Sequence, residues 1–317
     1  MKTGIIGASG YTGQELVSLL IRHPKIELCT ITSRAHAGKS VSQVIRRVGK
    51  VGHSLKFTNP SMASLLNGEV ELFFLALPHG TAAEYAVPLV EAGKKVIDLS
   101  ADFRLNDPKL YQEYYGSKPI SPEWLPKAQY GLPELHELSW EESPLIASPG
   151  CYPTSIITPL APLLKKGLIE TSDIIVNSIS GISGAGKNAS EHLLFCERNE
   201  SAGVYGLPKH RHLSEIEEQL SQFAQKSIVL SFHPHLGPMN RGICSTISVR
   251  AKGGLQANLI TKCWEDTYSG RPFVQILKNG DLPETGRVVG TNRIDLAVQE
   301  DSRTNRYILC SAEDNLL

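Results

Sequence analysis

Three glycines near the start of the chain constrain its fold more than any other feature. Gly7, Gly10 and Gly13 lie at the end of a strand-like segment, 3–7, and in front of a segment with leucines on one helical face. Glycines at this spacing let the turn close and let the backbone approach a pyrophosphate, whose charge is attracted to the start of the helix. The pattern predicts a dinucleotide-binding turn, with a purely structural glycine turn as the alternative.

Strand-like and helical segments alternate from this turn to residue 100. We expect strands at 3–7, 26–32, 70–77 and 95–100, and helices at 14–22 and 82–92. Segment 70–77 is apolar almost throughout, as is typical of a central strand in a parallel sheet. This order predicts an α/β Rossmann-type doubly wound domain over residues 1–147. Residues 105–145 show no clean periodicity, and we expect an irregular bridge there.

The pattern changes after residue 147. We expect long strands at 174–179 and 243–249, and helices at 212–225 and 255–268. Long strands separated by long insertions favour an α+β domain with a mixed or antiparallel sheet. We assign residues 148–300 to this second domain, which agrees with a chain of 317 residues that exceeds one ordinary core.

Composition narrows the class of protein. Lys and Arg together number 32, as do Asp and Glu, so charge gives no reason to expect a nucleic-acid or membrane partner. Six scattered cysteines without CxxC pairs indicate reduced thiols. The two His-x-His pairs could suggest zinc, but no cysteine pair stands at ligand spacing, and we expect no metal. Without a signal peptide or an apolar run long enough to span a bilayer, we expect a soluble cytoplasmic protein.

Cys151 is the strongest candidate for a reacting group. It lies in the stretch Ser-Pro-Gly-Cys-Tyr-Pro-Thr at 148–154, a sharp turn followed by residues that can open a helix. A cysteine at a helix N-terminus has a lowered pKa because the helix dipole stabilises its thiolate. The sequence therefore predicts a covalent nucleophile, against the alternative of a buried structural thiol.

The end of the second expected strand indicates which dinucleotide binds. An acidic residue there would hold the ribose hydroxyls of NAD, whereas this chain has Ser33 and Arg34. A hydroxyl and a guanidinium suit a 2′-phosphate, so we expect NADP. A glycine-rich loop at 180–187 could also offer backbone N–H groups to an anion. The expected cofactor-binding residues are Gly7, Ser9, Gly10, Tyr11, Thr12, Gly13, Ser33, Arg34, Ser183 and Gly184.

Three further clusters carry polar groups suited to an anionic substrate. They are 98–104, at the end of an expected parallel strand, 210–216, at the start of an expected helix, and 233–242, which we expect to be a loop held by Pro and Gly. Arginine favours bidentate contacts with phosphate and carboxylate groups. The expected substrate-binding residues are Arg104, Ser148, Arg211 and Arg241. Asp98 and Asp102 could equally pin a loop.

Taken together, these stretches resemble the N-acetyl-gamma-glutamyl-phosphate reductase family. The matching stretches run in the family's order over nearly the whole chain: GASGYTG at 7–13, ALPHG at 76–80, DLSADFR at 98–104, SPGCYPT at 148–154, SGISGAGK at 180–187, HRH at 210–212 and PMNRG at 238–242. The resemblance implies a Rossmann domain plus a catalytic and assembly domain, similar to aspartate-semialdehyde dehydrogenase. It implies a homo-oligomer, a dimer or a tetramer.

The resemblance also implies a reaction. Cys151 would attack an acyl phosphate, N-acetyl-L-glutamyl 5-phosphate, and NADPH would reduce the resulting thioester to the semialdehyde in arginine biosynthesis. By resemblance His210 is the acid/base and Glu215 its orienting partner, with His212 as the second choice for the acid/base. Three alternatives stay open: aspartyl phosphate as substrate, aminoadipyl phosphate as substrate, and a catalytically impaired NADP-binding protein.

The chain departs from the family pattern at several positions. Ser214 replaces a proline, and Gly237 and Asn240 replace a bulkier residue and a threonine. The family continues past the position of Leu317 with a helix that returns to the Rossmann domain. We therefore expect residues 301–317 to begin that returning segment. Without the helix itself, we expect this 317-residue chain to bind NADPH weakly.

Overall fold

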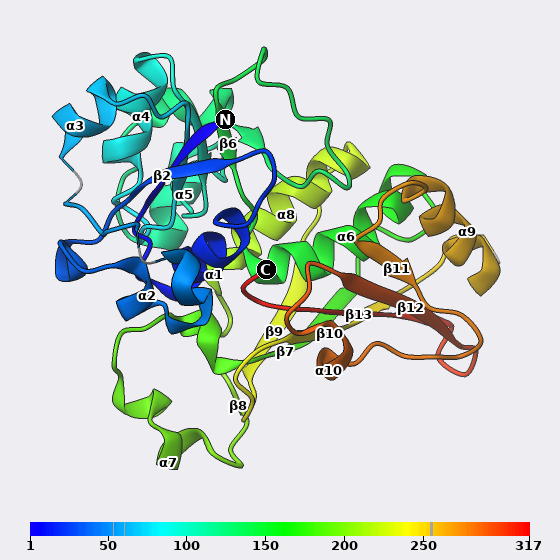
Figure 1. Cartoon of the computed structure of the whole chain (residues 1–317). Coiled ribbons are helices and arrows are strands. Elements are labelled where there is room, and N and C mark those ends of the chain that lie inside the picture. The colour runs from blue at the N-terminus through cyan, green and yellow to red at the C-terminus, as the bar shows by residue number, and fades with distance from the viewer. Residues whose placement is uncertain (53, 60, 254–255) are drawn as a thin grey trace. The chain divides into compact units, whose positions relative to one another are not determined.

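The computed structural model describes residues 1–52, 54–59, 61–253 and 256–317 (Figure 1). The chain forms two compact units, Met1–Pro149 and Gly150–Leu317. The expected division after residue 147 lies close to this boundary. Residues 301–317, expected to begin a segment that returns to the Rossmann domain, belong to the second unit, and Arg306–Glu313 form a strand of its sheet.

The first unit contains a six-stranded sheet in the order β2-β1-β3-β4-β6-β5, in which every neighbouring pair is parallel. This arrangement confirms the predicted Rossmann-type domain. Its strands are β1 (Lys2–Ile6), β2 (Glu27–Ile31), β3 (Leu72–Leu75), β4 (Lys95–Asp98), β5 (Gln129–Tyr130) and β6 (Leu145–Ala147). Its α-helices are α1 (Tyr11–Leu20), α2 (Val41–Val44), α3 (Met62–Asn67), α4 (Ala83–Glu91) and α5 (Pro108–Tyr115).

Two apolar clusters hold the helices of this unit to its sheet. Ile5 belongs to a cluster with Val17 of α1, whereas its neighbour Ile6 belongs to a cluster with Leu89 of α4. Successive strand residues point to opposite faces, so β1 supplies both clusters. The sheet is therefore buried on both faces, as its apolar strands predict.

The segment 105–145 is more regular than expected. It contains α5, whose N-terminus is capped by the Asp107 carboxylate accepting from the Lys109 N–H at 2.8 Å. Pro108 occupies the first turn, where its missing N–H costs nothing, and Gly116 ends the helix at φ +76°. The expectation of an irregular bridge is wrong for Pro108–Tyr115, because Asp107, Pro108 and Gly116 supply the start and stop of a helix there.

The second unit contains a seven-stranded mixed sheet in the order β11-β12-β13-β10-β7-β9-β8, as predicted for an α+β domain. The pairs β7–β9 and β11–β12 are parallel, and the other four are antiparallel. Its strands are β7 (Ile174–Ser180), β8 (Gly203–Val204), β9 (Leu230–Leu236), β10 (Ile243–Val249), β11 (Val274–Ile276), β12 (Ile294–Asp301) and β13 (Arg306–Glu313). Its α-helices are α6 (Cys151–Lys165), α7 (Phe195–Arg198), α8 (Arg211–Ala224), α9 (Ala257–Thr267) and α10 (Thr285–Val288).

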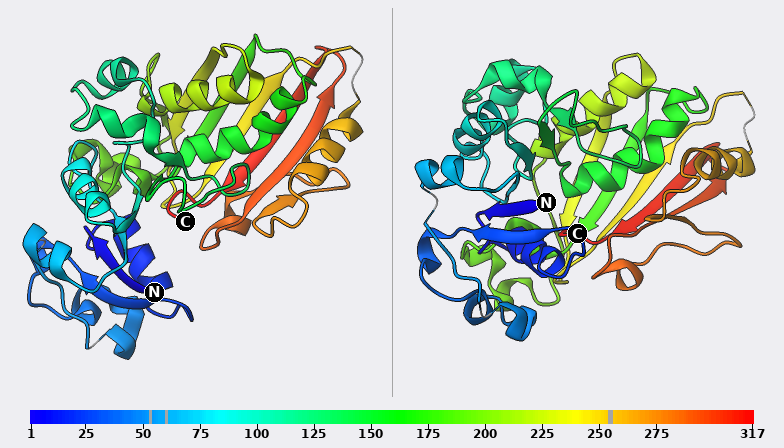
Figure 2. Two further views of the ribbon diagram at one scale, coloured as in Figure 1. Left: turned by 90° about the horizontal axis from the view of Figure 1, so that it is seen from above. Right: turned by 45° about the horizontal axis from the view of Figure 1, so that its top comes forward.

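Helix α6 is the central helix of this unit. It packs against β10 and β13, and both α8 and α9 pack against it. Figure 2 shows α6 and α8 side by side along the sheet. A chain of buried hydroxyls fixes α6 to the sheet, because Ser245 of β10 lies 2.9 Å from the Ser155 hydroxyl and 2.7 Å from that of Ser178. The start of α6 is therefore rigidly placed.

Two expectations for this unit change. The segment beginning at His233 is the second half of β9 and becomes a loop only after Leu236, because β9 lies next to the two-residue strand β8 and tolerates a proline there. The expected helix 255–268 begins at Ala257, while Leu255 lies outside the described residues.

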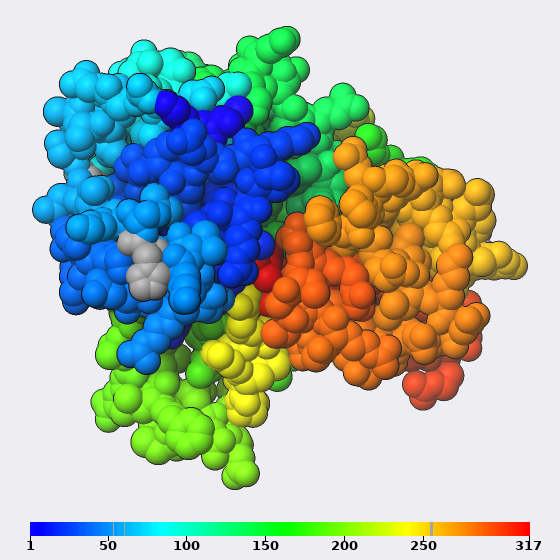
Figure 3. Space-filling model, viewed as in Figure 1, coloured from blue at the N-terminus to red at the C-terminus, as the bar shows by residue number. Residues whose placement is uncertain are grey.

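The segment that contains α7 lies at the surface of the unit, with Phe195 80% exposed (Figure 3). Among the helices described, none combines the length and apolar character needed to cross a membrane.

Candidate active site

The glycine turn of the first unit has the backbone that a dinucleotide site requires. Gly7 has φ +86°, and a Cβ there would stand 2.3 Å from the Ala76 carbonyl oxygen. A Cβ on Gly13 would stand 2.6 Å from the Ala8 Cα, so α1 packs closely on the turn. Gly10 is the N-cap residue of α1, and the predicted residues Tyr11 and Thr12 form its first turn. Gly7 and Gly13 are therefore required by close packing of backbone within the turn.

The end of β2 lies beside this turn. The Ser33 hydroxyl donates to the Ser9 hydroxyl at 2.9 Å, and the Gly7 N–H donates to the Thr32 hydroxyl at 3.3 Å. Arg34 is exposed, and a terminal nitrogen of its guanidinium donates to the Tyr85 hydroxyl at 3.1 Å. The structure thus brings the predicted phosphate-binding residues together. It adds Tyr85, which no local pattern marked, because it comes from α4.

Two acidic residues, Asp98 at the end of β4 and Asp102 beyond it, hold the loop that follows this strand. The buried Asp98 carboxylate accepts from the Ser100 N–H and hydroxyl, at 2.9 and 2.7 Å. Asp102 accepts from the Gly80 N–H at 2.6 Å and from the Tyr111 hydroxyl at 3.2 Å. Burial raises the pKa of Asp98 to about 7. Of the two readings left open for these carboxylates, the contacts favour the loop-pinning one.

Arg104 supports the backbone that leads to the cysteine turn. It is 8% exposed, and its Nε donates to the Ser148 carbonyl at 2.7 Å while a terminal nitrogen donates to the Leu99 carbonyl at 2.8 Å. The Ser148 N–H donates in turn to the Asp98 carbonyl at 2.7 Å. Both peptide groups of Ser148 are thus fixed. A substrate contact by Arg104 or Ser148 stays a prediction.

Cys151 is the first residue of α6, as expected, and Gly150 is the N-cap residue. The helix continues through Pro153, whose place in the first turn needs no N–H. Glu215 of α8 is fully buried, and its Oε1 accepts from the Gly150 N–H at 2.9 Å. Glu215, the predicted partner of His210, therefore binds the backbone N–H next to the predicted nucleophile.

His210 and His212 lie together beside Tyr152, the residue that follows the cysteine. The Tyr152 ring centroid is 5.5 Å from that of His210 and 6.0 Å from that of His212. His210 is the N-cap residue of α8, and its Nδ1 accepts from the His212 N–H at 3.1 Å. An accepting Nδ1 places the proton of the neutral ring on Nε2. Burial, and then the neighbouring Arg211 charge, lower the pKa of His210 to about 4, so the ring is neutral at pH 7.

Tyr205 joins this cluster from the segment before α8. Its hydroxyl donates to the Tyr152 hydroxyl at 3.1 Å, and its ring centroid is 5.4 Å from that of His210. Burial raises the pKa of Tyr205 to about 12, which keeps the hydroxyl protonated. Gly206, at φ +64°, fits here because a Cβ would stand 2.9 Å from His210 Cδ2. Sequence reasoning missed Tyr205, since an isolated tyrosine in an irregular segment carries no signal.

The glycine-rich loop after β7 is fixed to the loop that carries Arg241. The Gly181 N–H donates to the Gly242 carbonyl at 2.8 Å, and the Ser183 N–H donates to the Asn240 carbonyl at 3.1 Å. Ser183 is buried and Gly184 is exposed, which leaves only part of the predicted loop accessible. Arg211, at the start of α8, is exposed.

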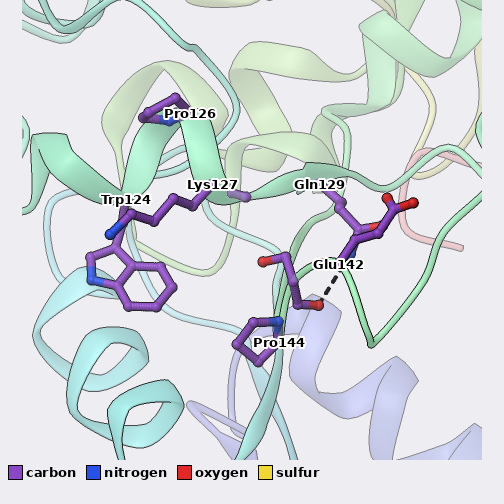
Figure 4. A pocket seen from close by; sticks show the side chains of 8 residues that line it. Trp124, Pro126, Lys127, Gln129, Glu142 and Pro144 are labelled. Carbon is purple, nitrogen blue, oxygen red and sulfur yellow. Dashed lines mark hydrogen bonds between the residues drawn. The ribbon is translucent and has the colours of Figure 1, made fainter.

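A cavity of about 450 Å³ in the first unit contains none of the predicted residues (Figure 4). Gln129 crosses one side of it and donates to the Ser143 carbonyl at 3.1 Å, and the Lys127 ammonium lies 4.7 Å from the Trp124 ring centroid. Among the described residues, no group of His, Cys, Asp and Glu has the arrangement of a metal site.

Sequence comparison places this chain among known proteins. Residues 2–142 match the semialdehyde dehydrogenase NAD-binding domain, and residues 151–315 match the semialdehyde dehydrogenase dimerisation domain. The chain is 48% identical to the N-acetyl-gamma-glutamyl-phosphate reductase of Akkermansia muciniphila, over 100% of this chain and 92% of that protein. It is 42% identical to the protein of the same name from Magnetococcus marinus, over 100% of this chain and 90% of that protein.

Structural comparison agrees on the fold. Aspartate semialdehyde dehydrogenase II of Vibrio cholerae, complexed with ASA, has a TM-score of 0.75 at 16% identity, covering 99% of this chain and 93% of that one. Aspartate semialdehyde dehydrogenase of Candida albicans with NADP has a TM-score of 0.67 at 17% identity, with the same coverage. The two domain matches and the full-length relatives show that the chain belongs to the N-acetyl-gamma-glutamyl-phosphate reductase family of the semialdehyde dehydrogenases.

Proposed function

We propose that this protein reduces N-acetyl-L-glutamyl 5-phosphate to N-acetyl-L-glutamate 5-semialdehyde, with NADPH as reductant and release of phosphate, in arginine biosynthesis. The observation that carries the proposal is the position of Cys151, the first residue of a helix, with Glu215 on the preceding N–H and two histidines beside the following residue. The identity of the acyl-phosphate substrate is inferred from the family to which the chain belongs.

Three side chains of the second unit have separate roles in the proposed reaction. The Cys151 thiolate attacks the acyl carbon, and phosphate leaves with the electrons of the broken C–O bond, which gives a thioester. When bound, NADPH supplies the hydride that reduces this thioester. The Nε2–H of the neutral His210 ring donates a hydrogen bond to the resulting oxyanion, which collapses to the aldehyde and expels the Cys151 thiolate. Glu215 holds Gly150, and through it the direction of the Cys151 side chain.

NADP fits the residues of the first unit. A Cβ at Gly10 would meet no atom closer than 3.8 Å, so the turn leaves room there for the pyrophosphate, while Gly7 and Gly13 allow the turn to pack tightly. Ser33 and Arg34 provide a hydroxyl and a guanidinium for the 2′-phosphate, and Tyr85 orients the guanidinium. Ser183 and Gly184 are proposed to contact the cofactor from the glycine-rich loop.

Arginines are proposed to hold the anionic ends of the substrate. Arg211 and Arg241 serve its phosphate and carboxylate groups, because a planar guanidinium can bind either in a bidentate manner. The dimerisation-domain match supports a homo-oligomer, which we propose to be a dimer or a tetramer.

The reverse reaction tests the function. Purified protein is mixed with N-acetylglutamate semialdehyde, phosphate or arsenate, and NADP, and reduced cofactor is followed by its absorbance. We expect turnover with this aldehyde and at most weak turnover with aspartate semialdehyde or aminoadipate semialdehyde. Preference for one of the other aldehydes would reassign the substrate. NADP binding without turnover on any aldehyde would indicate an impaired, cofactor-binding protein.

A further inference from the structure

Asp314 follows β13 and lies at the centre of a dense set of contacts. Its side chain is 0% exposed. Its Oδ1 accepts from Arg241 twice, from Nε at 3.0 Å and from a terminal nitrogen at 2.7 Å. Its Oδ2 accepts from the Gly290 N–H at 2.6 Å. The carboxylate is thus anchored to a second loop while it holds the arginine.

Asn315, which follows Asp314 in the chain, fixes the backbone beside Arg241. Asn315 Oδ1 accepts from the Gly242 N–H at 2.8 Å, and its amide nitrogen donates to the Ser183 hydroxyl at 3.1 Å. A Cβ on Gly242 would stand 2.7 Å from the Thr285 Cβ, so this loop has little room to move. Both the main chain and the guanidinium of Arg241 therefore depend on residues 314–315.

A second acidic residue, Glu313, precedes Asp314 in the chain. Glu313 is buried beside Asp314, and burial, reinforced by the Asp314 charge, raises its pKa well above the ordinary value. Asp314 is the acid of the two whose side chain contacts Arg241. A buried pair of this kind loses much when one partner is removed.

Because the guanidinium is planar, the contact with Asp314 fixes the orientation of the Arg241 side chain. Its N–H donors lie in one plane in a fixed fork, so an edge held by a carboxylate sets where the opposite edge points. Arg241 is 18% exposed at its side chain, in contrast to the fully buried acid. We infer that Asp314 is a positioning residue, which orients the guanidinium of Arg241 toward an anionic group of the acyl-phosphate substrate.

This inference rests on the proposed function, and a double-mutant cycle tests it. The four proteins are the unmodified chain, Asp314→Asn, Arg241→Gln and the double variant. KM is measured for phosphate, for N-acetylglutamate semialdehyde and for NADP in the reverse reaction. We expect each single variant to raise the KM of the same anionic substrate by about 10-fold or more, the usual size of a lost charged hydrogen bond. The KM for NADP should not change.

The cycle separates positioning from general destabilisation. If Asp314 acts through Arg241, Asp314→Asn adds no further loss of kcat/KM in the Arg241→Gln background. Asp173→Asn is the matched control, because Asp173 also pairs with arginines of this unit, Arg250 and Arg306, at an exposed position. The control variant should keep all three KM values.

Two outcomes would overturn the inference. One is an unchanged KM for both anions in Asp314→Asn, and the other is fully additive loss in the double variant. If Asp314→Asn does not fold, an unchanged KM for both anions in Arg241→Gln has the same force. Activity of the unmodified protein tests the proposed function separately, and calorimetric titration with inorganic phosphate compares the four proteins without turnover.

Discussion

Cys151 and the residue bound by Glu215 are neighbours in the chain. The dipole of α6 stabilises a thiolate at its first residue, and the Gly150 N–H that precedes it is held by a fully buried carboxylate. At the residue scale the proposed nucleophile therefore stands on a rigid support, an arrangement that would pre-orient its thiol.

Replacing Cys151 by serine should abolish turnover without affecting the fold. A serine hydroxyl is hardly ionised at pH 7 and is a poor substitute for a thiolate, so we expect kcat to fall by about three orders of magnitude or more. Steady-state kinetics and urea denaturation measure the two effects. Cys29→Ser, at an exposed position in the first unit, is the control and should keep full activity. Near-normal turnover by Cys151→Ser would contradict the mechanism.

Replacing Arg34 by alanine should weaken NADPH far more than NADH. The guanidinium is proposed to bind the 2′-phosphate that only NADPH carries, and a lost charged hydrogen bond reduces affinity by about 10- to 100-fold. Calorimetry on both cofactors gives the ratio. Arg22→Ala, at an exposed position of the same unit, is the control. Equal affinity of the unmodified protein for the two cofactors would rule out the assignment to NADP.

The depressed pKa of His210 makes stability depend on pH. The ordinary pKa is 6.5 and the folded value is about 4, so between these values the unfolded chain binds the extra proton. The free energy of unfolding should therefore fall as the pH drops from 6.5 to 4. Urea denaturation across this window should show a smaller fall for His210→Gln than for the unmodified protein. His23→Gln, an exposed histidine, should leave the slope unchanged. Identical slopes in all three proteins would contradict the burial argument.

At the scale of the element, the turn between β1 and α1 depends on how closely the helix packs. A Cβ on Gly13 would meet the Gly7 carbonyl oxygen at 2.6 Å, and a backbone atom cannot move aside as a flexible side chain can. A Cβ on Gly10 would come no closer than 3.8 Å to the nearest atom. The two glycines of one turn therefore have different structural roles.

This contrast gives a matched pair of variants. Gly13→Ala should lower the free energy of unfolding by about 1–3 kcal/mol, the usual cost of inserting a methyl group into a packed site. Gly10→Ala should stay within about 0.5 kcal/mol, because its φ of −66° suits alanine. Urea denaturation compares them. Equal losses would mean that the turn adjusts freely, against the packing seen here.

At the scale of the whole molecule, the sheet of the second unit has two different faces. Along β7 the residues alternate between buried and partly or fully exposed, and Ile175, Asn177 and Ile179 are on the more exposed face. The same alternation places Cys244 and Thr246 of β10 on that face. A large and partly apolar sheet face in a domain that matches a dimerisation domain is suited to a second copy of the chain.

Placing a long charge on this face should dissociate the oligomer. We expect the unmodified protein to sediment as a dimer or a tetramer, and Thr246→Arg to sediment as a smaller species, because the charge would be buried without a partner. Thr304→Arg, in the exposed hairpin between β12 and β13, is the control. A monomeric unmodified protein would contradict the oligomer, and an unaffected Thr246→Arg variant would move the interface elsewhere.

Local patterns were sufficient for much of this protein. The glycine spacing and the apolar segments determined the first sheet, and the Pro-Gly turn before Cys151 determined the start of α6, since both depend on residues close together in the chain. Helix α5 was missed although its signals, Asp107 and Pro108, are also local.

Contacts between distant segments were decided only by the tertiary structure. Glu215 reaches Gly150 across 65 positions, Tyr205 reaches Tyr152 across 53, and Asp314 reaches Arg241 across 73. The local sequence around one residue of such a pair does not reveal its partner, because the contact arises from strand order and helix packing. The sequence alone thus predicted the nucleophile and the class of cofactor, while strand order and helix packing decided which distant residues contact Gly150, Tyr152 and Arg241.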